Sequence, residues 1–364
     1  MGKRIVFTVT NDLTYDQRMH RICTTLQDAG YQVTLVGFTK KRSVPLVQNK
    51  YATVRLNPFF KKGKLFYLEY NFRLLLWLIK HPSDIYGAVD LDTLLPHVLI
   101  SSWRKKICVH DAHEYFTELP EIAHRPVIKS LWEWMARMLL PKVPYNYTVC
   151  TAIAHELQQR YGTTYAVIRN VPEIPPEMPV RDPVSPPVFL YQGALNRGRG
   201  IEQMMEAIGH VDASLWLAGE GDLSDELRQK AAAFPWADRI RFLGYIEPRV
   251  LPSVTAQAFA GMNLVSNDGK SYYYSLSNKF FDYIRTGIPQ ITMNYPEYRS
   301  LNEQYGVALT INSLEVADIR RAMESLLTNH DLYSQLAQNT VSAFKELNWE
   351  VEKMKLLQFY EHVS

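Results

Sequence analysis

Short apolar runs alternate with helix-like stretches along the whole of this 364-residue chain. In the first half the runs are apolar on both faces, as expected for buried strands of a parallel sheet; they read KRIVFTVT, QVTLVGF, DIYGAV, KICVHDA, YTVCTA and YAVIRN. The stretches between them predict helices at about residues 13–29, 63–80, 91–103, 128–140 and 152–161. Because parallel strands need crossover connections, the alternation predicts a doubly wound α/β sheet.

A proline-rich segment, RNVPEIPPEMPVRDPVSPP, separates two such patterns and holds seven of the chain's 20 prolines, so it predicts an extended linker. After it, VFLYQG, LWLAGEG, IRFLG, GMNLVS, QITMN and VALTIN alternate again with helical stretches. We therefore predict two Rossmann-like domains facing each other across a cleft, with ligands beyond the carboxyl ends of the strands. The predicted parts are residues 1–170, a linker at 171–187, a second domain at 188–345 and a closing helix at 346–364.

Composition narrows the class of protein. A hydrophobic content of 47% with 21% charged residues is typical of a soluble globular chain. The three cysteines, Cys23, Cys108 and Cys150, lie too far apart for a disulfide framework or a cysteine zinc site. The longest apolar run, LLLWLI, is too short to span a bilayer, and the chain opens directly on a strand without a secretory segment. These features predict a cytoplasmic protein, with the inner face of the membrane as a second expectation.

The net charge of +3 conceals an asymmetry between the two halves. Residues 1–170 hold 23 Lys and Arg against 13 Asp and Glu, whereas residues 171–364 hold 17 against 24. A basic half joined to an acidic half suggests that one domain meets an anionic partner.

Two stretches of the basic half mix aromatic, apolar and basic residues: FFKKGKLFYLEYNFRLLLWLIKH and RPVIKSLWEWMARMLLPK. Helices of this composition can lie in a lipid interface, and crossover helices with one buried face are the alternative. The interfacial reading would present either Trp132 and Trp134 or Phe59 and Phe60, with basic residues beside them: Lys61, Lys62 and Lys64.

The segment SLSNKFFDYIRTGIPQITM predicts a helix that begins after Ser277, whose hydroxyl would cap the first turn. Asn278 and Asp282 are one turn apart and share a face. A helix start that carries Lys279, with a carboxylate one turn deeper, suits a phosphate joined to a sugar hydroxyl.

The segment YQGALNRGRGIEQ predicts a strand, a glycine turn and a helix start. Gly193 would let backbone amides approach a phosphate, while Arg197 and Arg199 supply positive charge. The spacing is neither GxGxxG nor a P-loop, so neither a dinucleotide site nor a Walker site is supported, and an ordinary glycine turn is the alternative. Two weaker turns at strand ends, LAGEGD with Gly219 and FLGYIE with Tyr245, could face a base or a phosphate.

The segment HDAHEYF places His110, Asp111, His113 and Glu114 directly after an apolar strand. The two histidines lack the helical spacing that shares a face, so a metal site is disfavoured. We expect a substrate-facing cluster in which histidine donates a hydrogen bond or carries a proton.

Two further segments follow strands of the first half. In VDLDTLLP we expect Asp92 to cap the next helix and Asp90 to make a polar contact. In TNDLTYDQRMHRI, Asp16 and Arg18 fall on the opening helix, either beside the predicted cleft or on a solvated first turn.

With these residues assembled, the chain resembles the retaining GT-B glycosyltransferases of family four over nearly its whole length. The resemblance rests on an ordered set of blocks: TNDLTYDQRMHRICTTLQDAGYQVTLVGF, DLDTLLP, HDAHEYFTE, IRNVP, YQGALNRGRGIEQ, LAGEGD, FLGYIE and SNKFFDYIRTGIPQI. It implies a nucleotide-sugar donor in the second domain, a saccharide or lipid-linked acceptor on the first, and transfer with retention in bacterial glycan or glycolipid assembly. It also implies no essential metal or cofactor and a last helix that returns to the first domain. From the two aromatic-basic stretches and the charge of the first half we expect peripheral contact with an anionic membrane, and we expect no nucleic-acid partner.

The resemblance assigns roles to the residues above. The donor diphosphate would contact Gly193, Arg197, Arg199, Asn278 and Lys279, and the nucleoside Gly219, Tyr245 and Asp282. The donor sugar or acceptor would contact Asp16, Arg18, Asp90 and Tyr274, beside a catalytic cluster of His110, Asp111, His113 and Glu114. Members often pair two acids eight positions apart, but here Tyr274 takes the first place, which leaves the sugar open. Members also often carry arginine where this chain has Ala194.

Two rival functions remain at this point. A sugar-nucleotide epimerase on a similar fold would turn over a nucleotide sugar without an acceptor. A non-catalytic nucleotide-sugar-binding protein would be consistent with the missing first acid.

Overall fold

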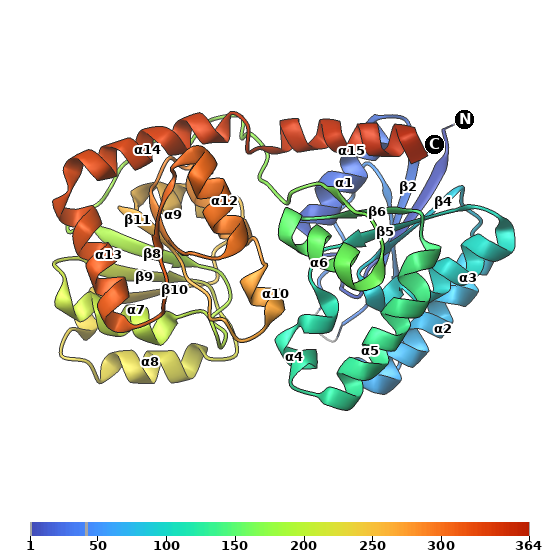
Figure 1. Ribbon diagram of the computed structural model, residues 1–364, viewed down its shortest axis with the longest axis horizontal. Helices are drawn as coiled ribbons and strands as arrows, with labels where there is room; N and C mark the ends of the chain where they lie inside the picture. The colour runs from blue at the N-terminus through green and yellow to red at the C-terminus, as the bar shows by residue number, and fades with distance from the viewer. Residues whose placement is uncertain (1, 41–42, 364) are drawn as a thin grey trace. The chain divides into compact units, whose positions relative to one another are not determined.

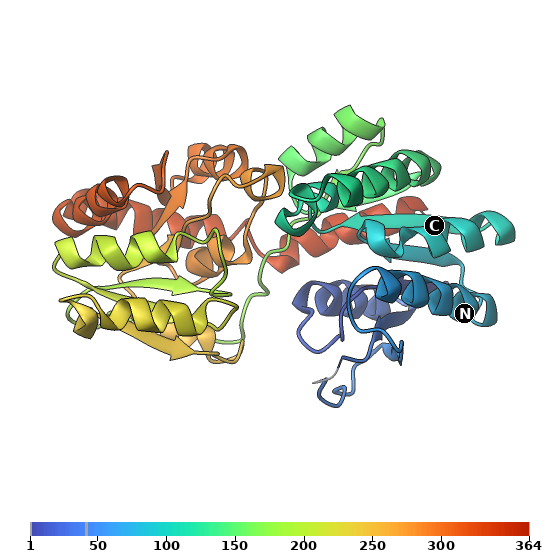
Figure 2. The ribbon, with the colours of Figure 1, turned by 90° about the horizontal axis from the view of Figure 1, so that it is seen from below.

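The computed structural model describes residues 2–40 and 43–363, which form two compact units. The amino-terminal unit comprises the chain up to Asn170 together with the chain from Glu352 onward, and the carboxyl-terminal unit is Val171–Val351. Each unit is a parallel sheet with helices on both faces (Figures 1 and 2), so the predicted doubly wound α/β class is confirmed.

The amino-terminal sheet has seven parallel strands in the order β3-β2-β1-β4-β5-β6-β7. These strands are β1 (Arg4–Thr8), β2 (Gln32–Phe38), β3 (Ala52–Leu56), β4 (Ile85–Val89), β5 (Ile107–Ala112), β6 (Tyr145–Thr148) and β7 (Ala166–Val167). Its helices are α1 (Gln17–Asp28), α2 (Lys64–Lys80), η1 (Leu91–Thr93), α3 (Leu94–Arg104), η2 (Phe116–Glu118), α4 (Pro120–Ala123), α5 (Pro126–Leu139), η3 (Leu140–Lys142) and α6 (Thr151–Tyr161). Figure 1 shows α1 on one face of this sheet and α2, α3 and α5 on the other.

The carboxyl-terminal sheet has six parallel strands in the order β10-β9-β8-β11-β12-β13. These strands are β8 (Val188–Gln192), β9 (Ser214–Ala218), β10 (Ile240–Gly244), β11 (Ala260–Asn263), β12 (Gln290–Met293) and β13 (Ala308–Ile311). Its helices are α7 (Ile201–Ala207), η4 (Ile208–His210), α8 (Ser224–Ala232), η5 (Ala237–Arg239), α9 (Leu251–Gln257), α10 (Lys270–Tyr273), α11 (Asn278–Arg285), α12 (Pro296–Tyr305), α13 (Val316–Thr328) and α14 (His330–Phe344). In both sheets the strand order reverses beside the first strand, the place where ligands of doubly wound folds bind.

The last helix, α15 (Trp349–Val363), packs on the amino-terminal sheet from Glu352 onward. Tyr360 is fully buried, and its ring lies 6.2 Å from that of Phe7 on β1. The Glu352 carboxylate accepts a hydrogen bond of 2.9 Å from the Arg169 amide. Aromatic packing and a buried carboxylate therefore fix this helix on the unit that begins the chain.

Sequence and structure differ at several elements. β3 was not among the expected strands, and the expected strand YTVCTA lies two residues earlier, at Tyr145–Thr148, because Thr151 already begins α6. The short helices α9 and α10 and the longer α12 were also not expected. Within the described residues, no helix has both the length and the apolar composition needed to cross a membrane.

Candidate functional site

Three glycine turns interlock at the carboxyl edge of the carboxyl-terminal sheet. The Gly193 amide, after β8, donates to the Ala218 carbonyl at 2.9 Å, and the Gly219 amide, after β9, donates to the Gly244 carbonyl at 2.8 Å. Gly219 has a φ of +146°, and a Cβ there would lie 1.9 Å from the Gly193 carbonyl oxygen. Only glycine fits this approach, so three adjacent strand ends form one continuous backbone surface.

Lys279, the second residue of α11, lies against this surface. Its Nζ is 4.3 Å from the centroid of the Tyr191 ring, and a Cβ on Gly193 would lie 3.6 Å from its Cε. The residue is 9% exposed, and its ammonium forms no ion pair or hydrogen bond with the described residues. Burial, and then the charge of Arg199, lower the pKa of Lys279 well below its ordinary value, while Asp282 acts in the opposite direction.

Arg199 is the better-placed arginine of the same turn. Its guanidinium lies 4.7 Å from the centroid of the Tyr272 ring, whereas the side chain of Arg197 is exposed. Gly198 between them has a φ of +78°, and a Cβ there would lie 2.8 Å from Ser266 Oγ. Tyr191 and Tyr272 thus provide ring surfaces for the two cations, a feature that sequence analysis missed.

Asp282 is tethered beside these cations. Its Oδ2 accepts from Gln192 Nε2 at 3.1 Å, and its Oδ1 lies 3.3 Å from Arg285 Nη2. Gln192 is itself fixed, because its Oε1 accepts from the Thr255 hydroxyl at 2.9 Å. The carboxylate is therefore held one turn inside α11, at the end of β8.

The expected cap at Ser277 is wrong. Its hydroxyl donates to Asn263 Oδ1 at 2.7 Å, and its amide donates to the Tyr298 hydroxyl at 3.1 Å. The side chain makes no capping bond to the described first turn of α11. The cause is local competition, since a buried amide oxygen on β11 takes the hydroxyl that the sequence assigned to the helix.

The remaining predicted residues of this unit lie around the same edge. Asn278 is exposed at the first position of α11, and Tyr245 is exposed just after β10. Tyr274 directly follows α10, and its ring packs 5.1 Å from that of Tyr273. The structure therefore brings Gly193, Arg199, Lys279 and Asp282 together most tightly.

In the amino-terminal unit, Arg18 and His113 converge on Asp111. Arg18 Nη2 lies 2.8 Å from Asp111 Oδ1, and His113 Nε2 lies 2.9 Å from Asp111 Oδ2. Arg18 is 4% exposed and also donates to the Ile168 carbonyl at 2.9 Å. The alternative that Arg18 lies on a solvated first turn of α1 is therefore wrong. Burial would raise the pKa of Asp111, but the charges of Arg18 and His113 hold it well below its ordinary value. Burial acts against protonation of His113, yet Asp111 raises its pKa.

At the end of β4, Asp92 is buried and Asp90 is half-buried. Asp90 Oδ1 accepts from the His113 amide at 2.9 Å, which is the expected polar contact. Asp92 does not sit in front of α3 as a cap: it lies inside η1, and its Oδ2 accepts from the Thr10 hydroxyl at 2.5 Å. Burial is the main cause that raises the pKa of each carboxyl to about 7.

Asp16 is the N-cap of α1. Its Oδ1 accepts from the Met19 amide at 3.0 Å, and its Oδ2 accepts from Asn11 Nδ2 at 2.7 Å. Its position on the helix is therefore explained by capping, which the sequence analysis did not consider.

His110 does not join the Arg18–Asp111–His113 group. Its Nδ1 lies 3.0 Å from the Tyr165 hydroxyl, and burial lowers its pKa to about 4. Its Nε2 lacks a partner among the described residues, and the residue lines a cavity of about 20 Å³ together with Glu114. A cavity of this size can hold one water molecule. Expecting one substrate-facing cluster was wrong for His110, since alternate residues of a strand point to opposite faces.

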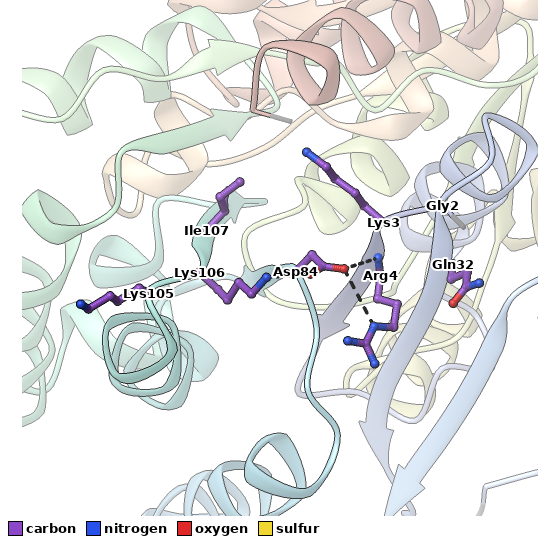
Figure 3. Close-up of a pocket in the computed structure, with 8 residues that line it drawn as sticks. All are labelled: Gly2, Lys3, Arg4, Gln32, Asp84, Lys105, Lys106 and Ile107. Carbon is purple, nitrogen blue, oxygen red and sulfur yellow. Dashed lines mark hydrogen bonds and ion pairs between the residues drawn. The ribbon is translucent and has the colours of Figure 1, made fainter.

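A larger hollow lies at the opposite edge of the amino-terminal sheet, away from all these residues (Figure 3). Its volume is about 560 Å³, and its lining includes four basic side chains, those of Lys3, Arg4, Lys105 and Lys106. Asp84 accepts from the Arg4 amide at 3.0 Å and from Lys106 Nζ at 2.9 Å. The described residues contain no cluster of three or more potential metal ligands, so the expectation of a metal-free site stays a prediction.

Comparisons with known proteins agree with the two-unit organisation. The model of the family described as Glycosyltransferase Family 4 matches residues 17–172, and that described as Glycosyl transferases group 1 matches residues 179–342. No curated protein matches the chain by sequence.

Several solved structures share the fold at low sequence identity. Sucrose-phosphate synthase from Thermosynechococcus elongatus superposes with a TM-score of 0.79 at 15% identity, covering 99% of each chain. Anabaena HepE in complex with UDP-glucose gives 0.76 at 12%, covering 99% of this chain and 100% of that one. WaaG, a glycosyltransferase involved in lipopolysaccharide biosynthesis, gives 0.71 at 13%, covering 97% and 98%. These likenesses show that the chain shares the GT-B fold. The two family matches follow one another along most of the sequence, so the chain belongs to the glycosyltransferases of family four.

Proposed function

We propose that this protein is a retaining glycosyltransferase that moves a sugar from a nucleoside-diphosphate donor to an acceptor, in the assembly of a bacterial glycan or glycolipid. The observation that supports this most is the environment of Lys279. A positive charge on a buried side chain is costly without an ion-pair partner, and the ammonium of Lys279 lies at the start of a helix and beside a glycine turn. A diphosphate would supply the missing negative charge.

The diphosphate would lie on Gly193, where the absent side chain leaves room above Lys279. Arg199 would approach it from the same turn, and Arg197 would add charge at the exposed end of that turn. The first-turn amides of α11, at Asn278, would contribute the positive end of the helix dipole.

The nucleoside would extend from the diphosphate toward Asp282. A carboxylate has several acceptor sites, so Asp282 can accept from ribose hydroxyls while it keeps its bond from Gln192. The turns that carry Gly219 and Tyr245 would face the base. Since HepE has been solved with UDP and with UDP-glucose on the same fold, UDP is the first nucleotide to test.

Catalysis would be largely electrostatic. The bond between the anomeric carbon and the diphosphate breaks, the acceptor oxygen bonds to that carbon on the same face, and the leaving phosphate takes the acceptor's proton. Lys279 and Arg199 would stabilise the departing charge in place of a divalent cation. Tyr274 would lie near the donor sugar, at the place where family members often carry an acid.

The acceptor, a saccharide or a lipid-linked sugar, would bind the amino-terminal unit at the ends of β4 and β5. His113 is the most exposed member of its group, with 19% of its side chain accessible. Asp111 and Arg18 fix its ring, and Asp90 fixes its backbone, so His113 is positioned to hydrogen-bond an acceptor hydroxyl.

The test begins with thermal stabilisation of the protein by UDP, GDP, ADP and dTDP, because ligands of the native state raise the melting temperature. The nucleotide that binds is then supplied as its sugar conjugates with and without acceptors, and products are followed by mass spectrometry. Acceptor-dependent release of nucleotide with retained configuration is expected. Turnover of the donor alone to an isomer would assign an epimerase, and binding without any product would assign a non-catalytic protein.

A further inference from the structure

Helix α2 carries apolar side chains on two opposite sides. One side is buried and contains Phe66, Tyr70, Leu74 and Leu78. The other side is exposed and, at spacings of three and four, contains Leu65, Leu68, Phe72, Leu76 and Ile79. A surface helix normally presents polar residues on the side away from the core, so the outer side of α2 needs an explanation.

Helices α5 and α3 repeat this pattern. On α5, Trp132, Ala136 and Leu139 are buried, whereas Val127, Leu131, Trp134 and Met138 are exposed. On α3, the exposed apolar residues are Leu99 and Trp103. Of the two tryptophans expected at a lipid interface, Trp132 is therefore in the core, and Trp134 is outside.

The three helices form one layer over the same face of the sheet, as Figures 1 and 2 show. The Tyr67 ring of α2 lies 5.6 Å from the Trp132 ring of α5, and Arg104 at the end of α3 donates to the Leu78 and Ile79 carbonyls of α2. Because the buried sides face the sheet, the exposed apolar side chains point away from it. We call these eleven exposed side chains of α2, α3 and α5 the outer apolar face.

The positive charge of the amino-terminal half is concentrated around this face. Residues 59–81, 94–106 and 125–142 contain 12 Lys and Arg against two Glu, while the other positions of 1–170 contain 11 basic and 11 acidic residues. Both glutamates are already paired with arginine, Glu69 with Arg73 and Glu133 with Arg160. The whole charge excess of this half therefore lies on the segments that carry the outer apolar face.

We propose that the outer apolar face is a docking surface for an anionic lipid membrane. Apolar and aromatic side chains ringed by lysine and arginine are the composition that binds such an interface, with Trp103 and Trp134 suited to its headgroup level. A second copy of the chain is a poor occupant, because two strongly positive faces would repel each other. The inference is independent of the proposed transfer reaction, since docking requires neither donor nor acceptor.

The basic margin continues beyond α3. Lys105 and Lys106 follow directly after Arg104, and both line the hollow of Figure 3 together with Lys3 and Arg4. Phosphate groups of lipids near the end of α3 would meet these side chains.

The test is co-sedimentation of the full chain with vesicles of phosphatidylcholine alone and of phosphatidylcholine mixed with phosphatidylglycerol. We expect binding only to the anionic vesicles, and a loss of binding as salt increases. A Lys62→Glu/Lys64→Glu/Lys80→Glu variant should bind at least about tenfold more weakly, because each exposed lysine contributes to attraction at an anionic surface. A matched charge reversal in the other unit, Arg320→Glu/Arg321→Glu, should bind as the wild type does.

The apolar contribution is tested with Leu68→Ser/Phe72→Ser, which changes only exposed positions and should retain the wild-type melting temperature. We expect this variant also to bind at least about tenfold more weakly, since two apolar anchors are lost. Its control is Val341→Ser, an exposed apolar position of α14. Equal recovery in the supernatant with both vesicle types at low salt would overturn the proposal. Salt-resistant self-association abolished by the same double substitution would also overturn it, in favour of a second copy.

Discussion

Arg18 in the amino-terminal unit and Lys279 in the carboxyl-terminal unit are both buried cations at the carboxyl edge of a sheet, and they differ in their partners. Arg18 lies 2.8 Å from the carboxylate of Asp111, whose second oxygen pairs with His113. Lys279 has an aromatic ring and a glycine turn around it, but it forms no ion pair with the described residues. Since a buried charge requires compensation, the first arrangement is complete within the protein, and the second calls for an anion from outside.

The Arg18–Asp111–His113 group should contribute mainly to stability, whereas Lys279 should contribute mainly to ligand binding. A satisfied charge network fixes the position of its members, so its loss should appear mainly as lost stability. An unsatisfied cation weakens the folded state in exchange for affinity, so its loss should appear mainly in ligand binding.

The largest expected effect comes from breaking the complete network. Asp111→Asn leaves the Arg18 guanidinium buried without its counter-charge, so it should lower the free energy of unfolding by about 3–5 kcal/mol. Chemical denaturation measures this change, with the fully exposed Asp225→Asn as the control. A loss as small as that of the control would mean that water or another group already compensates Arg18.

Removing the Lys279 charge should reduce activity rather than stability. Lys279→Met removes a charge-assisted contact to the donor diphosphate, so kcat/KM should fall at least about tenfold, which corresponds to roughly 1.5–3 kcal/mol. The melting temperature without ligand should stay the same or rise, because the variant no longer buries an unpaired charge. Lys345→Met, which replaces an exposed lysine, serves as the control. A destabilised Lys279→Met with normal kinetics would give Lys279 a structural role.

A smaller effect is expected at the ribose. Asp282→Asn keeps the size of the side chain but replaces a charged acceptor with a neutral one, a difference of about 1 kcal/mol per hydrogen bond. Affinity for the free nucleoside diphosphate should fall about fivefold in calorimetry, without a change of fold by circular dichroism. An unchanged affinity would remove Asp282 from the nucleoside site.

The last expected effect is a change of stability with pH. Burial raises the pKa of Asp90 and of Asp92 to about 7, above the ordinary value near 4, so the folded state binds protons more readily than the unfolded state does. Their contribution to stability is present below about pH 4 and is lost as pH rises toward 7. His113, with its raised pKa, acts in the same direction at higher pH, whereas Asp111 acts oppositely only below its ordinary pKa. The double substitution Asp90→Asn/Asp92→Asn should flatten the rise in melting temperature between about pH 7 and pH 5. An unaltered profile would assign the slope to other groups.

The fold was largely predictable from the sequence because its strands are buried on both faces. QVTLVGF was expected within the limits that the structure shows for β2. The strand β3 was missed because it is an edge strand, mostly half-exposed, and interrupted by Arg55. Edge strands carry weak apolar patterns, so their pairing is decided by the neighbouring strand. α12 was missed because it begins at Pro296 and buries few residues, so its sequence shows little of the apolar periodicity that predicts a helix.

The candidate site was predictable where it depends on local sequence. Glycines at strand ends and a lysine at a helix start reveal themselves by spacing, as Gly193 and Lys279 did. Contacts between distant segments could not be predicted from spacing. Tyr191, whose ring lies under Lys279, resembled any other strand residue, and the Arg18–Asp111 pair joins positions that are 93 residues apart. His110 was misplaced because proximity in sequence was taken for proximity in space.

The central claim, that Lys279 awaits a diphosphate, is tested most directly by titration calorimetry with UDP between about pH 7 and pH 9 in buffers of different ionisation enthalpy. Because burial and Arg199 lower the pKa of the free lysine and a bound anion raises it again, wild-type binding should be accompanied by proton uptake. Lys279→Met should bind at least about tenfold more weakly without that uptake, whereas Lys345→Met should match the wild type. Equal affinity and equal proton uptake in wild type and Lys279→Met would contradict the claim.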